Sequence, residues 1–275
     1  MHKSVSGVEL FTQSWTTEGK QPKCLVFYCH GIHAHCSEFE EFANYLVSNV
    51  SAFVFAHDHY GHGRSGGNRV NTPSFEIYVD DVAEHVKDLK NIYKDVPVFI
   101  FGCSLGGLIA YHVGLAYPKL AKGIILEGPA LTEVVNYNFL KSILNFVAGV
   151  APNLPLPTSF PSSELTTDPD QRKLMDDDPI SYRGGVKIHH GNLIAKAIDK
   201  AQNSFAEFSE PLLITFGGSD KVCSSEGAKA LIQNSPSSDK MLITYPGLKH
   251  ILHREIQPQR LKIFEDVKNW IAERI

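Results

Sequence analysis

The stretch VPVFIFGCSLGGLIAY, residues 96–111, decides the fold. It begins as a run of β-branched and aromatic residues, stops at Gly102, and resumes after Gly107 with the spacing of an apolar helix. This pattern predicts a buried strand, a very tight turn and a helix, with Ser104 at the apex of a G-x-S-x-G nucleophile elbow. The strained turn exposes the serine hydroxyl, and the helix N-terminus behind it favours developing negative charge. Ser104 is therefore the candidate nucleophile.

A second match to the same motif, residues 63–67, provides an internal comparison. Its serine, Ser65, follows a His-Gly pair instead of a strand and precedes a polar segment instead of a helix. Because the elbow requires a strand before the serine and a helix after it, the sequence predicts that Ser65 lies in a loop.

Strands and helices alternate on both sides of the elbow. A half-exposed edge strand is expected over residues 8–15. Buried strands are expected at 24–29, 52–56, 122–128, 211–218 and 240–245, and helices at 38–50, 75–93 and 260–275. Alternation of this kind predicts an α/β fold with a mostly parallel central sheet that is flanked by helices on both faces.

The middle of the chain departs from this alternation. Between residues 132 and 205 there is an apolar helical pattern at 139–147, a proline-rich connector, an acidic stretch at 176–178 and a second helical pattern at 191–201. We expect residues 132–205 to form a helical cap, inserted before the strand at 211–218. Residues 1–131 and 206–275 would then form the core. Such an insertion should cover the carboxyl edge of the sheet, where ligands of open α/β sheets bind.

Composition excludes some partners and indicates a compartment. The net charge of −4 gives no electrostatic basis for nucleic acid binding. An odd number of scattered cysteines is typical of free thiols in a reducing compartment. The sequence shows no apolar signal segment and no membrane-spanning run, which predicts a cytoplasmic protein. The cysteines are Cys24, Cys29, Cys36, Cys103 and Cys223.

A serine nucleophile needs a base and an acid that orients the base. In hydrolases with this elbow, the acid and then the histidine follow the serine along the chain. Asp220, just after the strand at 211–218, is the preferred acid, and Glu127, one strand earlier, is a second candidate. His250 follows the last strand and is the preferred base, with His253 as the alternative.

Two backbone N–H groups are needed to stabilise the oxyanion of an acyl-transfer intermediate. Leu105, the residue after the nucleophile, should supply one of them. The turn after the strand at 24–29 should supply the other, and we assign it to Ile32. Hydrolysis by these groups would require no cofactor and no metal.

With these residues in place, the chain resembles monoacylglycerol lipases, which are serine hydrolases of the α/β-hydrolase fold. The similarity extends from residue 8 to the C-terminus and includes the elbow, residues 56–63, 178–179, 219–227 and 250–253. It implies a triad of Ser104, Asp220 and His250. It also implies an oxyanion hole at Ile32 and Leu105, and a monoacylglycerol substrate.

The resemblance also implies roles for the cap and for two residues near the site. His253 matches a residue that contacts the polar head of the substrate, and Cys223 matches a thiol near the site. The cap of the family is hydrophobic and faces the membrane, which implies peripheral membrane contact here.

Three residues depart from the family pattern. Cys103 replaces the histidine that usually precedes the nucleophile, and Ala34 and Glu38 stand where the family has Glu and Arg. Those two positions help to hold glycerol in relatives. A related carboxylesterase or lysophospholipase with another head-group preference is therefore an alternative.

Two further hypotheses belong to other classes of function. A metal-dependent hydrolase is suggested by the histidine-rich segment 57–62, although Gly61 replaces the aspartate that the motif of binuclear zinc enzymes requires. A non-catalytic binding protein of the same fold would be expected to have lost part of the triad or the oxyanion loop, and the sequence retains both.

Overall fold

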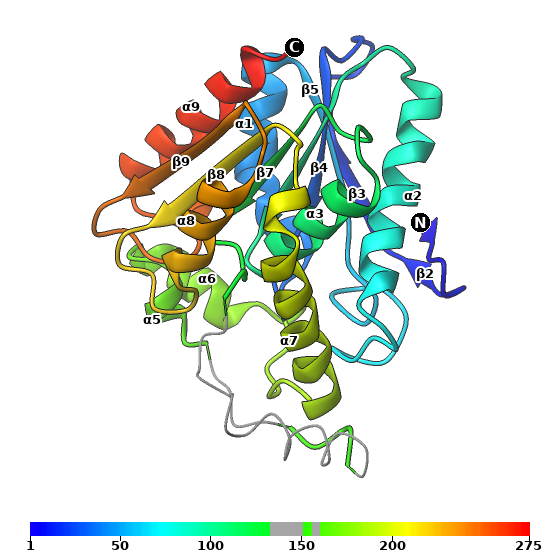
Figure 1. Cartoon of the computed structure of the whole chain (residues 1–275), viewed down its shortest axis with the longest axis vertical. Coiled ribbons are helices and arrows are strands. Elements are labelled where there is room, and N and C mark those ends of the chain that lie inside the picture. The colour runs from blue at the N-terminus through cyan, green and yellow to red at the C-terminus, as the bar shows by residue number, and fades with distance from the viewer. Residues whose placement is uncertain (133–150, 156–159) are drawn as a thin grey trace.

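The computed structural model describes residues 1–132, 151–155 and 160–275. Its centre is a seven-stranded sheet in the order β3-β5-β4-β6-β7-β8-β9, in which β3 pairs antiparallel with β5 and the other neighbouring strands pair parallel (Figure 1). The mostly parallel sheet is as predicted. The strands are β3 (Thr12–Trp15), β4 (Cys24–Cys29), β5 (Ala52–His57), β6 (Val98–Cys103), β7 (Gly123–Glu127), β8 (Leu212–Gly217) and β9 (Lys240–Tyr245). A separate short hairpin pairs β1 (His2–Lys3) with β2 (Glu9–Leu10).

Helices cover both faces of the sheet, which explains why its central strands are continuous apolar runs. Along β4, residues 25, 27 and 29 pack into one apolar layer and residues 24, 26 and 28 into the other. The first layer includes α2 (Glu76–Ile92), α3 (Leu105–Ala116) and α8 (Ser225–Asn234); the second includes α1 (Glu40–Val50) and α9 (Gln259–Ala272) (Figure 1). Helix α8 was not predicted from the sequence.

The elbow between β6 and α3 has the strained backbone that the motif predicts. Ser104 has a φ of 56° and a ψ of −117°, a region that side-chain-bearing residues rarely occupy. Backbone segments approach each other closely at the elbow. A Cβ at Gly102 would clash with the Gly106 carbonyl oxygen, and a Cβ at Gly106 would clash with the Cys29 carbonyl oxygen. Glycine is therefore required on both sides of the serine.

The segment between β7 and β8 contains three described α-helices: α5 (Ser162–Leu165), α6 (Pro169–Asp177) and α7 (Ile188–Asn203). The expected helix at 191–201 is confirmed in α7. Helices α5 and α6, which follow the proline-rich segment, were not predicted from the sequence, and α6 includes the first two residues of the acidic stretch at 176–178. Asp168 caps α6 by accepting hydrogen bonds from the amides of residues 170 and 171. The apolar helix expected at 139–147 lies outside the described residues.

Of the helices in the described parts of the chain, not one combines the length and the apolar character needed to cross a bilayer.

Candidate active site

Ser104 and His250 line one cavity, and Asp220 lies directly behind the histidine. Asp220 follows β8 and His250 follows β9, so the parallel register of the two strands brings them to one edge of the sheet. His250 Nδ1 lies 2.8 Å from Asp220 Oδ2, and both side chains are almost wholly buried. The other oxygen of Asp220 accepts the amides of Val222 (2.7 Å) and Cys223 (3.0 Å). With its Nδ1 proton donated to Asp220, neutral His250 has Nε2 available to accept a proton.

The loop that carries His250 is fixed by a second buried carboxylate, that of Glu255. Glu255 accepts the Lys249 amide through Oε1 (2.6 Å) and the Thr167 amide through Oε2 (2.9 Å). The Ile251 amide in turn donates to the Leu165 carbonyl (2.8 Å). The histidine loop is therefore joined to both α5 and the turn before α6.

Glu127 and His253 form a second histidine–carboxylate pair beside the first. Glu127 ends β7, and its Oε1 lies 2.6 Å from His253 Nδ1, while its Oε2 accepts the His253 amide at 3.1 Å. His253 lies in the 3₁₀ turn η4 (Leu252–Arg254) and lines the cavity. The structure therefore pairs Asp220 with His250, and Glu127, the second candidate acid, is the partner of His253.

Two cysteines, Cys103 and Cys223, line the same cavity as the nucleophile. Cys223 lines the cavity, and its thiol interacts with the Ser104 hydroxyl. Burial, and then the charge of Asp220, raises the pKa of this thiol. Burial, and then Glu127, likewise raises the pKa of Cys103 well above its usual value. Both side chains are therefore neutral thiols near neutral pH.

The two predicted oxyanion donors lie beside Ser104. Ile32 and Leu105 both line the cavity, and Leu105 is the first residue of α3, so its N–H has no partner within the helix. The loop that carries Ile32 approaches the nucleophile closely, because a Cβ added at Gly31 would lie 3.5 Å from the Ser104 Cβ.

The cavity has a volume of about 750 Å³, and most of its lining is apolar. Core and insertion both contribute to its walls. Its apolar lining includes Ile32, Phe160, Leu165, Ile194, Ile198 and Val222. Its polar lining includes Tyr28, Glu38, Ser181, Arg183 and His253. A long apolar chain with one polar end fits a site of this composition.

The histidine-rich segment is packed as part of the protein interior. His30 Nε2 accepts the His59 amide at 2.9 Å, and His62 Nδ1 lies 3.0 Å from the Tyr60 carbonyl. Burial lowers the pKa of His30 to about 3 and that of His59 well below its usual value. Ser65 lies in the loop, as predicted, where its hydroxyl accepts the Phe11 amide and donates to the Asp58 carbonyl.

Two groups of potential metal ligands occur among the described residues: Cys103, Glu127 and His253, and His35, Glu38 and Asp178. Neither group contains a residue of the segment 57–62 that suggested the metal-dependent alternative. Hydrogen bonds within the groups already join His253 to Glu127 and His35 to Asp178.

The fold and this site together define the class of α/β hydrolases that carry the nucleophile on a strand–helix elbow. Comparison with known proteins agrees. The sequence matches the family described as Hydrolase_4, serine aminopeptidase S33, over residues 20–257. It is 34% identical to the monoglyceride lipase of Mus musculus, over 99% of this chain and 89% of that protein.

Solved structures show the same fold. The monoacylglycerol lipase of Paleococcus ferrophilus superposes with a TM-score of 0.83 at 21% identity, covering 97% of this chain and 100% of that one. A soluble variant of the Saccharomyces cerevisiae monoglyceride lipase, in complex with a substrate analogue, gives 0.88 at 20% identity and covers 100% and 94%. The chain belongs to the serine aminopeptidase S33 family of α/β hydrolases and is a carboxylic ester hydrolase.

Sequence reasoning missed several groups around this site. The pairing of Glu127 with His253 and of Glu38 with Arg254 joins residues far apart in the chain. One local signal was present, because Glu127 is an acidic residue at the end of an otherwise apolar strand.

Proposed function

We propose that this protein hydrolyses monoacylglycerols to a free fatty acid and glycerol. The observation that carries the proposal is the site itself: a serine on a strained elbow and a histidine paired with a buried aspartate, where serine and histidine line a largely apolar cavity. The relatives that are monoglyceride lipases support the choice of substrate.

Ser104, His250 and Asp220 act as the catalytic triad in this proposal. Ser104 Oγ attacks the ester carbonyl while His250 Nε2 takes its proton, and Asp220 stabilises the imidazolium that forms. The amides of Ile32 and Leu105 donate to the oxyanion. Collapse of the intermediate expels the glycerol oxygen, which takes the proton from His250. Water, deprotonated by His250, then cleaves the acyl-enzyme and releases the fatty acid and Ser104.

The remaining assignments concern binding and location. His253 contacts the polar head of the substrate in this proposal, Cys223 contacts the substrate near the nucleophile, and both line the cavity. Residues 132–205 act as a cap over the site, with residues 1–131 and 206–275 as the core. The apolar cap brings a cytoplasmic protein into peripheral contact with the membrane that holds its substrate, and the reaction uses no cofactor.

The test is fatty acid release from monoacylglycerol, diacylglycerol, triacylglycerol and lysophospholipid by the wild type and by Ser104→Ala. We expect turnover of monoacylglycerol to exceed that of the other three and to fall on the order of 10⁴-fold or more in the variant. Ser104-dependent turnover of lysophospholipid or other esters in place of monoacylglycerol would overturn the substrate and leave the mechanism. Turnover that survives Ser104→Ala would overturn both.

A further inference from the structure

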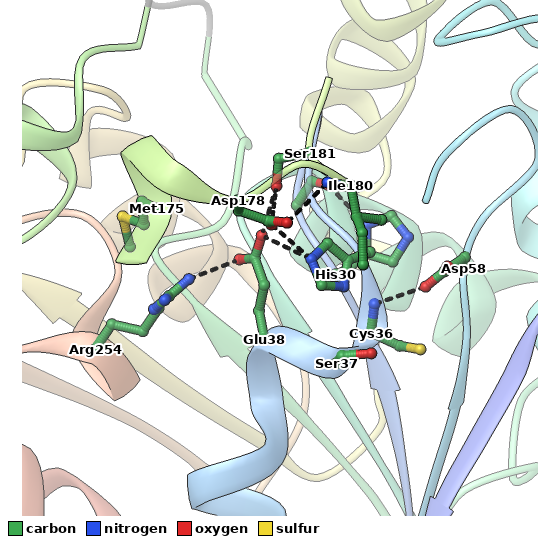
Figure 2. Close-up of polar contacts among 12 residues, drawn as sticks. His30, Cys36, Ser37, Glu38, Asp58, Met175, Asp178, Ile180, Ser181 and Arg254 are labelled. Atoms are coloured by element: carbon green, nitrogen blue, oxygen red, sulfur yellow. Dashed lines mark hydrogen bonds and ion pairs between the residues drawn. The ribbon is translucent and has the colours of Figure 1, made fainter. Parts of the chain in front are cut away.

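Glu38 places a carboxylate in the wall of the cavity. It lies in the 3₁₀ turn η1 (Cys36–Phe39), lines the cavity, and its side chain is 11% exposed. Oε2 lies 3.2 Å from Arg254 Nη1, and Oε1 lies 3.2 Å from the Ser181 hydroxyl, whose single proton has Asp178 Oδ2 as its nearer acceptor at 2.6 Å. Figure 2 shows Arg254 approaching Glu38 from one side and Ser181 and Asp178 from the other.

Arg254 is held firmly enough to fix the position of that carboxylate. Its side chain is 10% exposed, and its Nε donates to Gln171 Oε1 of α6 at 2.8 Å. An ion pair between two largely buried side chains, in which the arginine has a further hydrogen bond to Gln171, keeps both groups in one geometry. The unusual residue at position 38 therefore has a dedicated partner in this chain.

Besides the donors Arg254 and Ser181, acceptor groups lie in the same part of the cavity wall. In the tautomer in which His253 Nδ1 donates to Glu127, Nε2 is an acceptor, and this buried atom has no hydrogen-bond partner among the described residues. Asp178, paired with His35, brings a second carboxylate within 4.8 Å of Glu38. Burial is the main cause that raises the pKa of Tyr28; Cys103, Glu38 and Glu127 add to it, and Arg254 opposes it. The carboxylates of Glu38 and Glu127 therefore both act on one phenol at the cavity wall.

Acceptors and negative charge recognise a neutral group that carries hydroxyl donors and disfavour an anion. We propose that Glu38, positioned by Arg254, sets head-group specificity by accepting a hydroxyl of a neutral polyol and by repelling a phosphate. The inference rests on the proposed function, because it concerns the leaving group of the same reaction. It adds that a carboxylate beside the head group favours a neutral polyol over a phosphate.

The test compares three substrates with one acyl chain: a 1-monoacylglycerol, the 1-acylglycerol 3-phosphate, and the methyl ester, which has no head group. For Glu38→Gln, we expect kcat/KM for the monoacylglycerol relative to the methyl ester to fall about tenfold, mainly through KM, since a charged acceptor is lost. The ratio of kcat/KM for the phosphate to that for the methyl ester should rise in the same variant.

Matched variants separate a specific effect from a structural one. Glu40→Gln, which changes an exposed residue two positions away, should keep both ratios at their wild-type values. Arg254→Gln should lower the monoacylglycerol ratio as Glu38→Gln does, because Glu38 loses the partner that positions it. It should not raise the phosphate ratio, because it removes a positive charge beside Glu38, and Arg254→Lys should retain more of the wild-type preference. Thermal unfolding of each variant checks that it is folded.

Unchanged ratios in a folded Glu38→Gln protein would overturn the inference, even with Ser104-dependent monoacylglycerol hydrolysis intact. Loss of the proposed function would look different. In that case the wild type would not hydrolyse monoacylglycerol, and the ratio of phosphate to methyl ester would still report whether Glu38 repels an anion.

Discussion

Two buried histidine–carboxylate pairs involve histidines that are three positions apart in the chain. Asp220–His250 and Glu127–His253 have similar distances of 2.8 and 2.6 Å and similar burial. They differ in surroundings. His250 is in the loop that follows β9, whereas His253 packs edge-on against Tyr28, Phe39 and Phe101. We infer that the first pair moves protons and that the second holds an acceptor in place.

Replacing the two carboxylates separately tests this division. Asp220→Asn should lower kcat on a methyl ester by about 10⁴-fold, because the amide favours the wrong histidine tautomer. Glu127→Gln should lower it far less, since its histidine takes no proton from Ser104. Steady-state kinetics on both variants, with thermal melts to check folding, gives the comparison. A loss in Glu127→Gln as large as that in Asp220→Asn would contradict the assignment.

The sequence predicted the residues that motifs and chain order identify and missed those that only the sheet register brings together. Ser104, Asp220 and His250 each follow a recognisable strand, so their meeting could be predicted. Glu127 and His253 are 126 positions apart, and Glu38 and Arg254 are still further apart. Such pairs have no local sequence pattern, because they form only when the fold brings distant segments of the chain together.

At the scale of elements, buried strands were predicted well and short helices poorly. Strands such as β4 and β6 are covered on both faces, so their apolar runs are unambiguous. Helix α6 has only nine residues, is mostly charged and buries no residue, so it has no apolar stripe. Its cap, Asp168 followed by Pro169, was the available signal.

The contact between the segment after α6 and the oxyanion loop yields a prediction about stability. His35 Nε2 lies 2.7 Å from Asp178 Oδ2, and the Tyr182 amide donates to the His33 carbonyl at 2.9 Å. Despite partial burial, hydrogen bonds from Ser181, the Ile180 amide and His35 lower the pKa of Asp178 to about 2. The stabilisation is therefore complete above the unfolded-state pKa, near 4, and is lost as the pH falls towards 2.

Asp178→Asn should lower the free energy of unfolding at pH 7 by about 1–3 kcal/mol, since it weakens several buried hydrogen bonds to a charged acceptor. The neighbouring Asp177→Asn is the control. The side chain of Asp177 is 70% exposed, and its ion pair with Lys173 is long, at 3.9 Å. Its replacement should therefore change stability by less than about 0.5 kcal/mol. Denaturant unfolding of both variants makes the measurement, and equal effects would contradict a specific role for Asp178.

At the scale of the whole molecule, the buried histidines predict sensitivity to acid. Burial lowers the pKa of His30, His85 and His190 to about 3, and that of His33 and His112 to about 4. Between these values and the unfolded-state value of 6.5, the unfolded chain binds protons that the folded protein does not. Stability should therefore fall as the pH drops below 6.5, by up to about 1.4 kcal/mol per pH unit for each histidine.

Asp81 opposes this trend, because burial raises its pKa to about 6 in the folded protein. One carboxylate does not offset five histidines, so the net slope keeps its sign. His190→Leu tests the origin of the slope, since both ring nitrogens of His190 are buried without hydrogen-bond partners among the described residues. Between pH 5 and 6.5, the variant should lose less stability than the wild type. An identical pH dependence would contradict the prediction.

We expect Ser104 to be the activated serine of this chain. Ser65, in the second G-x-S-x-G segment, serves as the comparison. The most direct measurement is reaction with a fluorophosphonate, followed by peptide mass spectrometry. We predict one adduct per chain, on Ser104, lost in Ser104→Ala and formed much more slowly in His250→Ala, with Ser65 unmodified. No adduct on Ser104, or labelling of Ser65 to the same extent, would contradict the account.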